Sequence, residues 1–298
     1  MLKLPPIEVI DRQTGDRFVE AVYGEAAIAF LYGRGRLLHP LLHNPLFSVL
    51  YGKVQGSRLS RHKVLPFIKK YGLDTTEFET EPADFRSFND FFIRKLKAGA
   101  RRIADSAAVL PADGRYLFFP KIEEEHTFFA KGQRFSLKEF LRSSRLAAQY
   151  EGGAMVIGRL CPTDYHRFHF PADGIPSESS LINGWLASVN PAAIRDNMKI
   201  FWENRRSLTP LQTPHLGRIL IVEVGALCVG KIHQTYVANK RVKRGDEKGY
   251  FSFGGSSVVL LFEPGRITFD PDLVAASGEG LEVMCLMGQS LGKSASPQ

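Results

Sequence analysis

The stretch YFSFGGSSVVLLFEPG, residues 250–265, is an aromatic and β-branched run that two glycines and two serines interrupt. A run of this composition is typical of a buried β-strand. Glycine weakens the interior of a strand and usually marks a bulge, a bend or the close approach of another backbone. On its own, the interruption at residues 254–257 therefore predicts a β-bulge within one strand. A chemical role for these glycines and serines would require catalytic groups elsewhere in the sequence.

Runs of the same kind fill the chain after Leu110 and are separated by Gly, Pro and Asp. Short runs between such residues favour β-strands over helices. The sequence therefore predicts a β-rich domain built from these runs: RYLFFPKI (115–122), AMVIGRL (154–160), YHRFHFP (165–171), GRILIVEVGALCVGKIHQTYV (217–237) and LEVMCLMG (281–288).

Helical patterns dominate the first hundred residues and recur twice later. Residues 19–33 have helical propensity, and residues 87–99 begin with Ser87, a good N-cap. Residues 136–148 and 190–205 carry N-cap signals and apolar residues at helical spacing. We therefore expect helices both before and within the β-rich part.

Together these patterns predict an α+β fold, in which a helical N-terminal region precedes a β-rich, mainly antiparallel domain with inserted helices. The boundaries follow the changes in composition along the chain. We expect a helical, basic region over residues 1–105, the β-rich domain over 106–290 and a flexible tail over 291–298.

The composition is that of an ordinary globular protein, with 298 residues, 44% hydrophobic and 23% charged. Cys161, Cys228 and Cys285 each lie in an apolar run, which favours reduced, buried thiols of a cytosolic protein. No spacing of Cys and His is typical of a metal site, so we expect none. The chain has no apolar run of about 18 residues, and we expect no transmembrane helix.

The net charge of +8 is concentrated near the N-terminus. Residues 26–73 contain no acidic residue and carry eight basic ones among apolar segments. Such a segment suits an anionic membrane surface, although a solvated helical face would look the same. Nucleic acid is not expected as a partner, because no nucleic-acid-binding module is present. The residues assigned to membrane docking are Arg58, Arg61, Lys63, Lys69 and Lys70.

Three clusters in the β-rich part carry groups that take part in catalysis. Asp113 lies in PADGR, His166 and His169 lie in DYHRFHFP, and Ser256 lies in the Gly-Gly-Ser-Ser interruption. Each alone has an ordinary interpretation, as a turn, a core histidine or a bulge. Together they supply the acid, imidazole and hydroxyl that activate a serine. A serine hydrolase using Asp113, His169 and Ser256 therefore stays open, although the G-x-S-x-G elbow of many hydrolases is absent.

The sequence resembles the bacterial phosphatidylserine decarboxylases, which belong to the pyruvoyl-dependent decarboxylases. The resemblance extends over residues 88–269, whereas the first 80 residues are similar only in character. The stretches that carry it are SFNDFFIRKLKAGARRI, PADGR, KGQRFSLKEFL, RLCPTDYHRFHFPADG, SVNPAA, FWENRR, VEVGALCVGKI and KGYFSFGGSSVVLLFEPG.

The resemblance implies that the chain cuts itself. Ser256 would attack the carbonyl of Gly255, and elimination followed by hydrolysis would leave a pyruvoyl group at residue 256. That group would form a Schiff base with phosphatidylserine and accept electrons as carbon dioxide leaves, as pyridoxal phosphate does elsewhere. By the same resemblance His169 is the base of the cleavage, Asp113 orients it, and His166 assists decarboxylation or protonates the product.

The resemblance also implies partners and a location. The product is phosphatidylethanolamine, and the active molecule is a heterodimer of its own long and short chains, with a homodimer of these as the family habit. A lipid substrate favours the membrane interpretation of the basic segment, so we expect a peripheral protein on the cytoplasmic face of the cell membrane.

One local departure bears on the cleavage point. Many family members have Leu-Gly-Ser-Thr where this chain has Gly254-Gly255-Ser256-Ser257. Cleavage before Ser257 would require attack on the carbonyl of a residue with a Cβ, so we predict cleavage before Ser256. Besides the serine hydrolase, a lipid-binding homologue that has lost its chemistry remains as an alternative, and it would stay a single chain.

Overall fold

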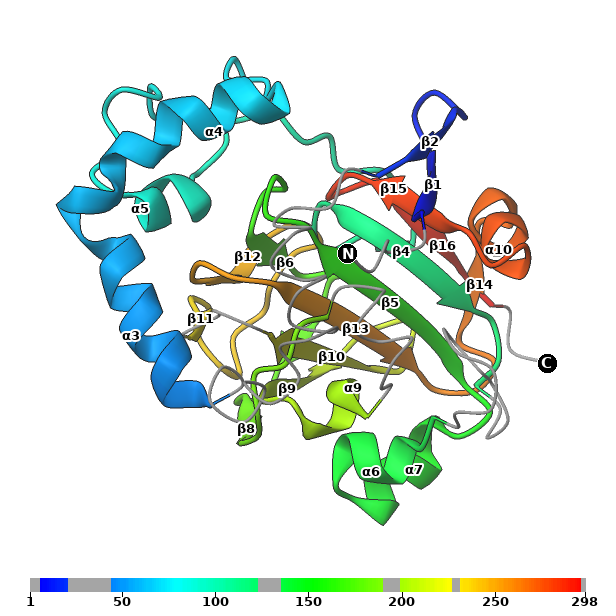
Figure 1. Cartoon of the computed structure of the whole chain (residues 1–298). Coiled ribbons are helices and arrows are strands. Elements are labelled where there is room, and N and C mark those ends of the chain that lie inside the picture. Colours follow the sequence, from blue (N-terminus) through cyan, green and yellow to red (C-terminus); the bar gives the residue numbers. More distant parts are fainter. Residues whose placement is uncertain (1–5, 21–43, 123–134, 190–198, 227–230, 296–298) are drawn as a thin grey trace.

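The computed structural model describes residues 6–20, 44–122, 135–189, 199–226 and 231–295. Its centre is a ten-stranded sheet (Figure 1). Neighbouring strands of this sheet pair antiparallel, except for the parallel pair β1 and β15, so the mainly antiparallel prediction is confirmed. The strand order is β2 (Arg17–Val19), β1 (Glu8–Asp11), β15 (Glu282–Cys285), β4 (Gly114–Phe119), β5 (Ala154–Leu160), β13 (Ser256–Phe262), β10 (Arg218–Gly225), β9 (Arg206–Gln212) and β7 (Ile175–Pro176), and β8 (Ser180–Ile182) also pairs with β9.

Two smaller sheets accompany the central one. Side chains of β13 alternate between two apolar cores, because Val258 and Leu260 lie in one and Val259 and Leu261 in the other. The first core also contains Phe168 of one small sheet and Phe269 of the other, so both contribute to it. The sheets are β11 (Ile232–Gln234), β12 (Glu247–Phe251) and β6 (Arg167–His169), and β14 (Ile267–Phe269), β16 (Ser290–Ser294) and β3 (Ala108–Val109).

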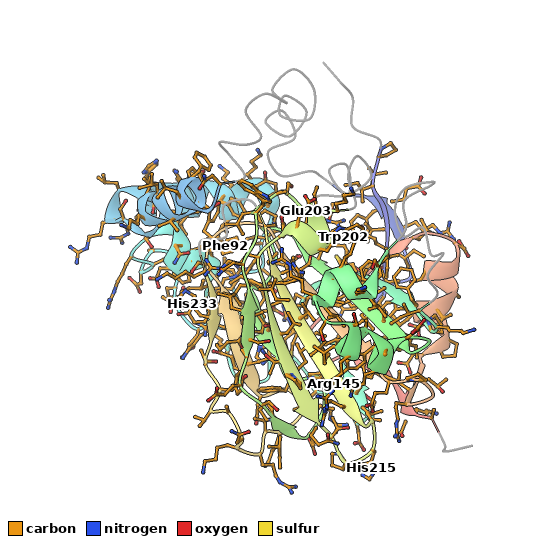
Figure 2. The ribbon with its side chains drawn as sticks, turned by 90° about the horizontal axis from the view of Figure 1, so that it is seen from below. Phe92, Arg145, Trp202, Glu203, His215 and His233 are labelled. Carbon is orange, nitrogen blue, oxygen red and sulfur yellow. The ribbon has the colours of Figure 1, made fainter. Side chains whose placement is uncertain are left out.

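A group of helices lies at one side of the sheets (Figure 1). Figure 2 shows them from another direction, with Phe92 where the helices meet the strands. An aromatic cluster holds this group together, and Phe253 of the β12–β13 connection belongs to the same cluster. The members are α3 (Pro45–Gly56), the 3-10 helix η2 (Arg58–Lys63), α4 (Val64–Tyr71) and α5 (Phe88–Phe92), while α6 (Leu137–Leu141), α7 (Ser144–Tyr150), α9 (Ile200–Glu203) and α10 (Pro271–Gly278) lie elsewhere.

The prediction of one strand over residues 250–265 was wrong. β12 ends at Phe251 and β13 begins at Ser256, and the two strands belong to different sheets. The glycines therefore lie in a connection between sheets instead of a bulge. Gly254 has a φ of 141°, which favours glycine strongly. The local pattern could not reveal the change of sheet, because the residues before the glycines and those after the serines are both typical of a buried strand.

The N-terminal region is only partly helical. Residues 8–19 contain β1 and β2, which extend the central sheet, so an all-helical region was a wrong expectation there. The expected helix over 19–33 lies almost wholly outside the described residues. The prediction of a flexible tail was also wrong for residues 291–294, because β16 pairs with β14 and Leu291 is buried.

Two other predicted helices are shorter than expected. The helix that starts after Ser87 ends at Phe92, because Leu96 pairs with Phe78 in an isolated bridge. The helix over 136–148 divides into α6 and α7 at Arg142, which has a left-handed φ of 47°. Of the helix over 190–205, residues 199–205 are described, and α9 ends at Glu203 because Asn204 is extended, so the prediction was wrong for its last two residues.

Candidate active site

The connection over residues 252–255 is held at three points. The N–H of Ser252 donates to the carbonyl of Lys231 at 3.1 Å. The N–H of Phe253 donates to Oδ1 of Asn89 at 2.8 Å, which fixes the connection to α5. The carbonyl of Gly255 accepts a hydrogen bond of 3.2 Å from the N–H of Ala226. The backbone before Ser256 is therefore positioned by β10, by α5 and by the segment before β11.

Ser256 begins β13 in the middle of the central sheet, opposite Gly225 on β10 and Leu160 on β5. The residue is fully buried. Its Oγ has no hydrogen-bond partner among the described residues, and the same holds for Ser257. A buried hydroxyl normally finds a partner, so these two are exceptions. Ser256 is the first residue of β13 and directly follows Gly255, whose carbonyl accepts from the Ala226 N–H.

His166 lies in the segment that follows β5, and its carbonyl accepts a hydrogen bond of 3.0 Å from the N–H of Phe251 at the end of β12. Nδ1 donates to the carbonyl of Asp164 at 3.0 Å, which leaves the lone pair on Nε2. Nε2 is buried and has no partner among the described residues. Burial lowers the pKa of His166 from 6.5 to about 4, so the ring is neutral at neutral pH.

Aromatic contacts connect His166 to the connection itself. The ring of His166 lies 3.8 Å from that of Phe92, centroid to centroid. Phe92 in turn lies 4.9 Å from Phe253, three residues before Ser256. Phe92 thus connects His166 to the segment that leads to Ser256.

His169 is held by different groups from those expected. Its Nδ1 donates to the carbonyl of Gly245 at 2.8 Å, and the hydroxyl of Tyr165 lies 3.2 Å from Nε2. Burial lowers the pKa of His169, while the Gly245 carbonyl and the charges of Glu247 and Asp113 oppose that effect. Both ring nitrogens are therefore occupied by groups other than Asp113, which acts on His169 through its charge.

Asp113 is the centre of a separate cluster. Arg101 donates to both carboxylate oxygens, with Nη2 2.7 Å from Oδ2 and Nε 3.0 Å from Oδ1. The N–H of Met287 also donates to Oδ1 at 2.8 Å. The carboxylate of Asp113 is thus ion-paired with Arg101. It lies near β6, because the N–H of His169 donates to the carbonyl of Pro111 at 2.7 Å.

Several groups at this site were not found from the sequence. Asn89 lies in a motif that we interpreted only as a helix start, and Tyr165 directly precedes His166. The Ala226 N–H is a backbone group, and the type of a residue does not show which bond its backbone makes. Only Asn89, a polar residue among the three phenylalanines of α5, offered a signal.

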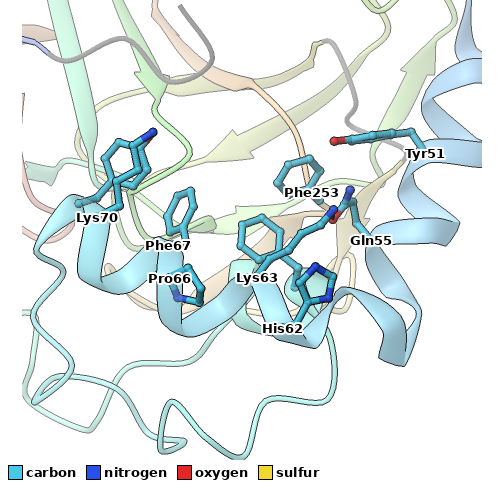
Figure 3. Close-up of a pocket in the computed structure, with 10 residues that line it drawn as sticks. Tyr51, Gln55, His62, Lys63, Pro66, Phe67, Lys70 and Phe253 are labelled. Atoms are coloured by element: carbon cyan, nitrogen blue, oxygen red, sulfur yellow. Dashed lines mark hydrogen bonds between the residues drawn. The ribbon is translucent and has the colours of Figure 1, made fainter.

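A cavity of about 320 Å³ lies beside the connection (Figure 3). Tyr51 and Gln55 of α3 line one side of it, and Phe67 and Lys70 of α4 line another. Phe253 also lines the cavity, so the cavity reaches the segment that leads to Ser256. Its walls combine aromatic rings with the basic residues His62, Lys63 and Lys70.

Comparisons with known proteins show the family of this chain. The family model described as phosphatidylserine decarboxylase matches residues 88–293, which include Asp113, both histidines and Ser256. The chain belongs to the phosphatidylserine decarboxylase family. Within this family, the phosphatidylserine decarboxylase proenzyme of Chlamydia muridarum is 48% identical over 290 residues, covering 95% of this chain and 96% of the relative.

Two further relatives in the phosphatidylserine decarboxylase family carry the same proenzyme name. That of Chlamydia caviae is 48% identical over 293 residues, covering 97% of this chain and 98% of the relative. That of Chlamydia pneumoniae is 45% identical over 292 residues, covering 96% of this chain and 97% of the relative. The similarity therefore includes the N-terminal helices and strands that the family model does not match.

Proposed function

We propose that this chain is a phosphatidylserine decarboxylase proenzyme that cuts itself between Gly255 and Ser256. The observation that carries the proposal is the buried Oγ of Ser256, which has no partner among the described residues and follows in the chain a carbonyl that the Ala226 N–H holds in place. Cleavage before Ser257 is less favoured, since the Ser256–Ser257 bond lies inside the ladder with both neighbouring strands paired.

The cleavage balances with water as the only co-reactant. Ser256 Oγ forms a bond to the Gly255 carbonyl carbon, the amide C–N bond breaks, and the hydroxyl proton passes through a base to the released nitrogen. Loss of the Ser256 α-proton then expels the Gly255 carboxylate. Water converts the remaining enamine to a pyruvoyl ketone and releases ammonia. The pyruvoyl group supplies the electron-withdrawing carbonyl that decarboxylation needs.

The two histidines fit different steps. Nδ1–H donation places the lone pair on Nε2 of each ring, so both can accept a proton. The charge of Asp113 favours a proton on His169, whereas Arg94 disfavours one on His166. We therefore assign the base of the cleavage to His169, with Tyr165 next to it. We assign proton transfer during decarboxylation to His166, whose neutral ring can take up a proton at Nε2 and pass it on.

The exposed side of α3, η2 and α4 is suited to an anionic membrane. Leu46, Leu50 and Val54 recur every four residues along α3 and are exposed, and Leu59 is 83% exposed. No helix among the described residues is long and apolar enough to cross a membrane. We define the docking face as Leu46, Leu50, Val54, Leu59 and Leu65 together with Lys53, Arg58 and Lys69.

The basic residues expected to dock divide into two groups. Arg58, Lys69 and Lys70 are exposed. Arg61 donates to the carbonyl of Ala83 and Lys63 to Oε1 of Gln55, so these two are partly engaged. Lys63 and Lys70 also line the cavity that reaches Phe253, and we propose that the phosphatidylserine headgroup enters there from the membrane.

The proposed activity is tested with vesicles that contain phosphatidylserine. The wild-type chain and Ser257→Ala are expected to split and release carbon dioxide, whereas Ser256→Ala stays whole and releases none. A serine hydrolase would release acyl or headgroup products without splitting. A lipid-binding homologue would bind the vesicles and release nothing, and either result contradicts the proposal.

A further inference from the structure

The peptide unit between Gly225 and Ala226 contacts the proposed cleavage point through its N–H. β10 and β13 pair up to Gly225 and Ser256. One more ladder bond follows, in which the N–H of Ala226 donates to the carbonyl of Gly255 at 3.2 Å. This is the carbonyl that Ser256 would attack. Its oxygen becomes negative in the tetrahedral intermediate, where a preorganised donor stabilises it most.

The other side of the same peptide unit is held by Asn204, which is fully buried. Its Nδ2 donates to the carbonyl of Gly225 at 3.0 Å and to that of Ala187 at 2.8 Å. Its Oδ1 accepts from the N–H of Ala187 at 2.9 Å. A donor on the Gly225 oxygen polarises that peptide group and strengthens its N–H as a donor.

The position of Asn204 is itself fixed. Its N–H donates to the carbonyl of Ile200 at 3.0 Å, where α9 ends. Its carbonyl accepts from the Arg206 guanidinium at 2.7 Å, where β9 begins. The side chain is therefore preorganised for the Gly225 carbonyl before any chemistry occurs.

We infer that the Ala226 N–H is the oxyanion donor of the self-cleavage and that Asn204 is the positioning residue that orients and polarises it. This inference rests on the proposed cleavage between Gly255 and Ser256. During the attack, the Gly255 carbonyl oxygen gains the electron pair of its double bond. The Ala226 hydrogen bond shortens as that charge develops, and the pair returns when the amide C–N bond breaks.

The direct test replaces one backbone N–H by an ester oxygen, which cannot donate a hydrogen bond. Lactic acid, the α-hydroxy analogue of alanine, is introduced at position 226 by nonsense suppression in cell-free translation, so that an ester oxygen replaces the Ala226 N–H. Chain splitting is then followed with time on gels. We expect splitting to slow about 100-fold, the usual cost of one lost oxyanion donor.

The matched control is the same exchange at Val222, in the ladder of the same strand and away from Gly255. It removes one ladder bond and is expected to split at nearly the wild-type rate. Equal rates for the two ester variants would overturn the inference. If the wild-type chain itself did not split, the proposed function would fail instead, so the two failures are distinguishable.

Asn204→Asp provides a second, independent test. The variant keeps an acceptor for the Ala187 N–H and loses the donor to Gly225. We expect splitting to slow at least about tenfold relative to the Val222 ester variant, with both variants compared by their urea unfolding midpoints. A loss of splitting that merely follows the loss of stability would mean that Asn204 only supports the fold, and the positioning role would be rejected.

Discussion

Gly254 and Gly255 are neighbours with different requirements. Gly254 has a φ of 141°, a value that residues with a Cβ rarely adopt. A Cβ on Gly255 would lie 3.5 Å from Cβ of Ala226 and 3.7 Å from Cγ2 of Val189, which are ordinary contacts. We expect Gly254→Ala to lower the free energy of unfolding by about 1–3 kcal/mol and Gly255→Ala by less than about 1 kcal/mol. Urea unfolding in an uncleaved Ser256→Ala background measures both, and equal losses would contradict this account.

His166 makes stability depend on pH. Its pKa falls from 6.5 in an unfolded chain to about 4 in the folded one, because burial disfavours the charged ring. Below about pH 6.5 the unfolded chain binds a proton that the folded chain does not, so stability is lost as the pH falls towards about 4. A shift of this size corresponds to about 3 kcal/mol.

The His166→Phe variant keeps the aromatic contact with Phe92 and removes this titration. In the Ser256→Ala background, we expect it to lose less stability between about pH 7 and about pH 4.5 than the chain with His166 does. Urea midpoints at the two pH values give the comparison. Equal losses would show that the ring is already protonated or already solvated.

β5 is tied to its neighbours by a buried ionic cluster. Arg159 donates to Glu282 of β15 at 2.6 and 2.7 Å and to Glu20 at 2.6 Å. Removing the guanidinium would leave the buried Glu282 carboxylate without its counter-charge and would leave Glu20 with Arg115 alone. We expect Arg159→Met to lower the free energy of unfolding by about 3–5 kcal/mol. The control is Arg17→Met, whose exposed pair with Glu279 is worth less than about 1 kcal/mol, and similar losses for both variants would refute the prediction.

The sequence predicted the strands after Leu110 well, because short apolar runs separated by Gly, Pro and Asp are a local signal of strands. It failed where distant residues decide the structure. Residues after Phe92 leave the helix because Arg94 donates to the carbonyls of Thr163 and Asp164, and Leu96 pairs with Phe78. The assignment of β12 and β13 to different sheets also depends on partners far away in the chain.

At the scale of the whole molecule, we propose that the docking face is the surface that contacts the membrane. Replacing Leu46, Leu50 and Val54 by Gln is expected to weaken binding to anionic vesicles at least about tenfold, since each buried apolar side chain contributes more than about 1 kcal/mol. The control replaces Leu181 and Val237, which are equally exposed elsewhere. Binding that falls equally in both sets would place the docking surface elsewhere.

Charge should contribute to the same binding. Replacing Arg58, Arg61, Lys63, Lys69 and Lys70 by Gln is expected to weaken vesicle binding and to reduce its dependence on salt, because each cation near the surface adds about 1 kcal/mol. Self-cleavage serves as the internal control and should continue, which shows that the fold is intact. Unchanged binding at low salt would contradict the proposed orientation.

Across the whole molecule, the sequence named in advance the side chains to which we assign the proposed chemistry. Ser256, His166, His169 and Asp113 were all named from their motifs, and the structure buries all four. It could not identify the Ala226 N–H, because a backbone donor has no residue signature. Nor could it show that Asp113 is ion-paired with Arg101, since a contact between residues of separate motifs appears only in the fold.

The intact mass of the purified chain tests the self-cleavage most directly. Wild-type protein should give two fragments, one ending at Gly255 and one beginning at residue 256. The second should be lighter, by the mass of one ammonia, than a fragment beginning with serine, and Ser256→Ala should give a single uncut mass. An active wild-type molecule that is uncut and still carries its serine at position 256 would contradict the account.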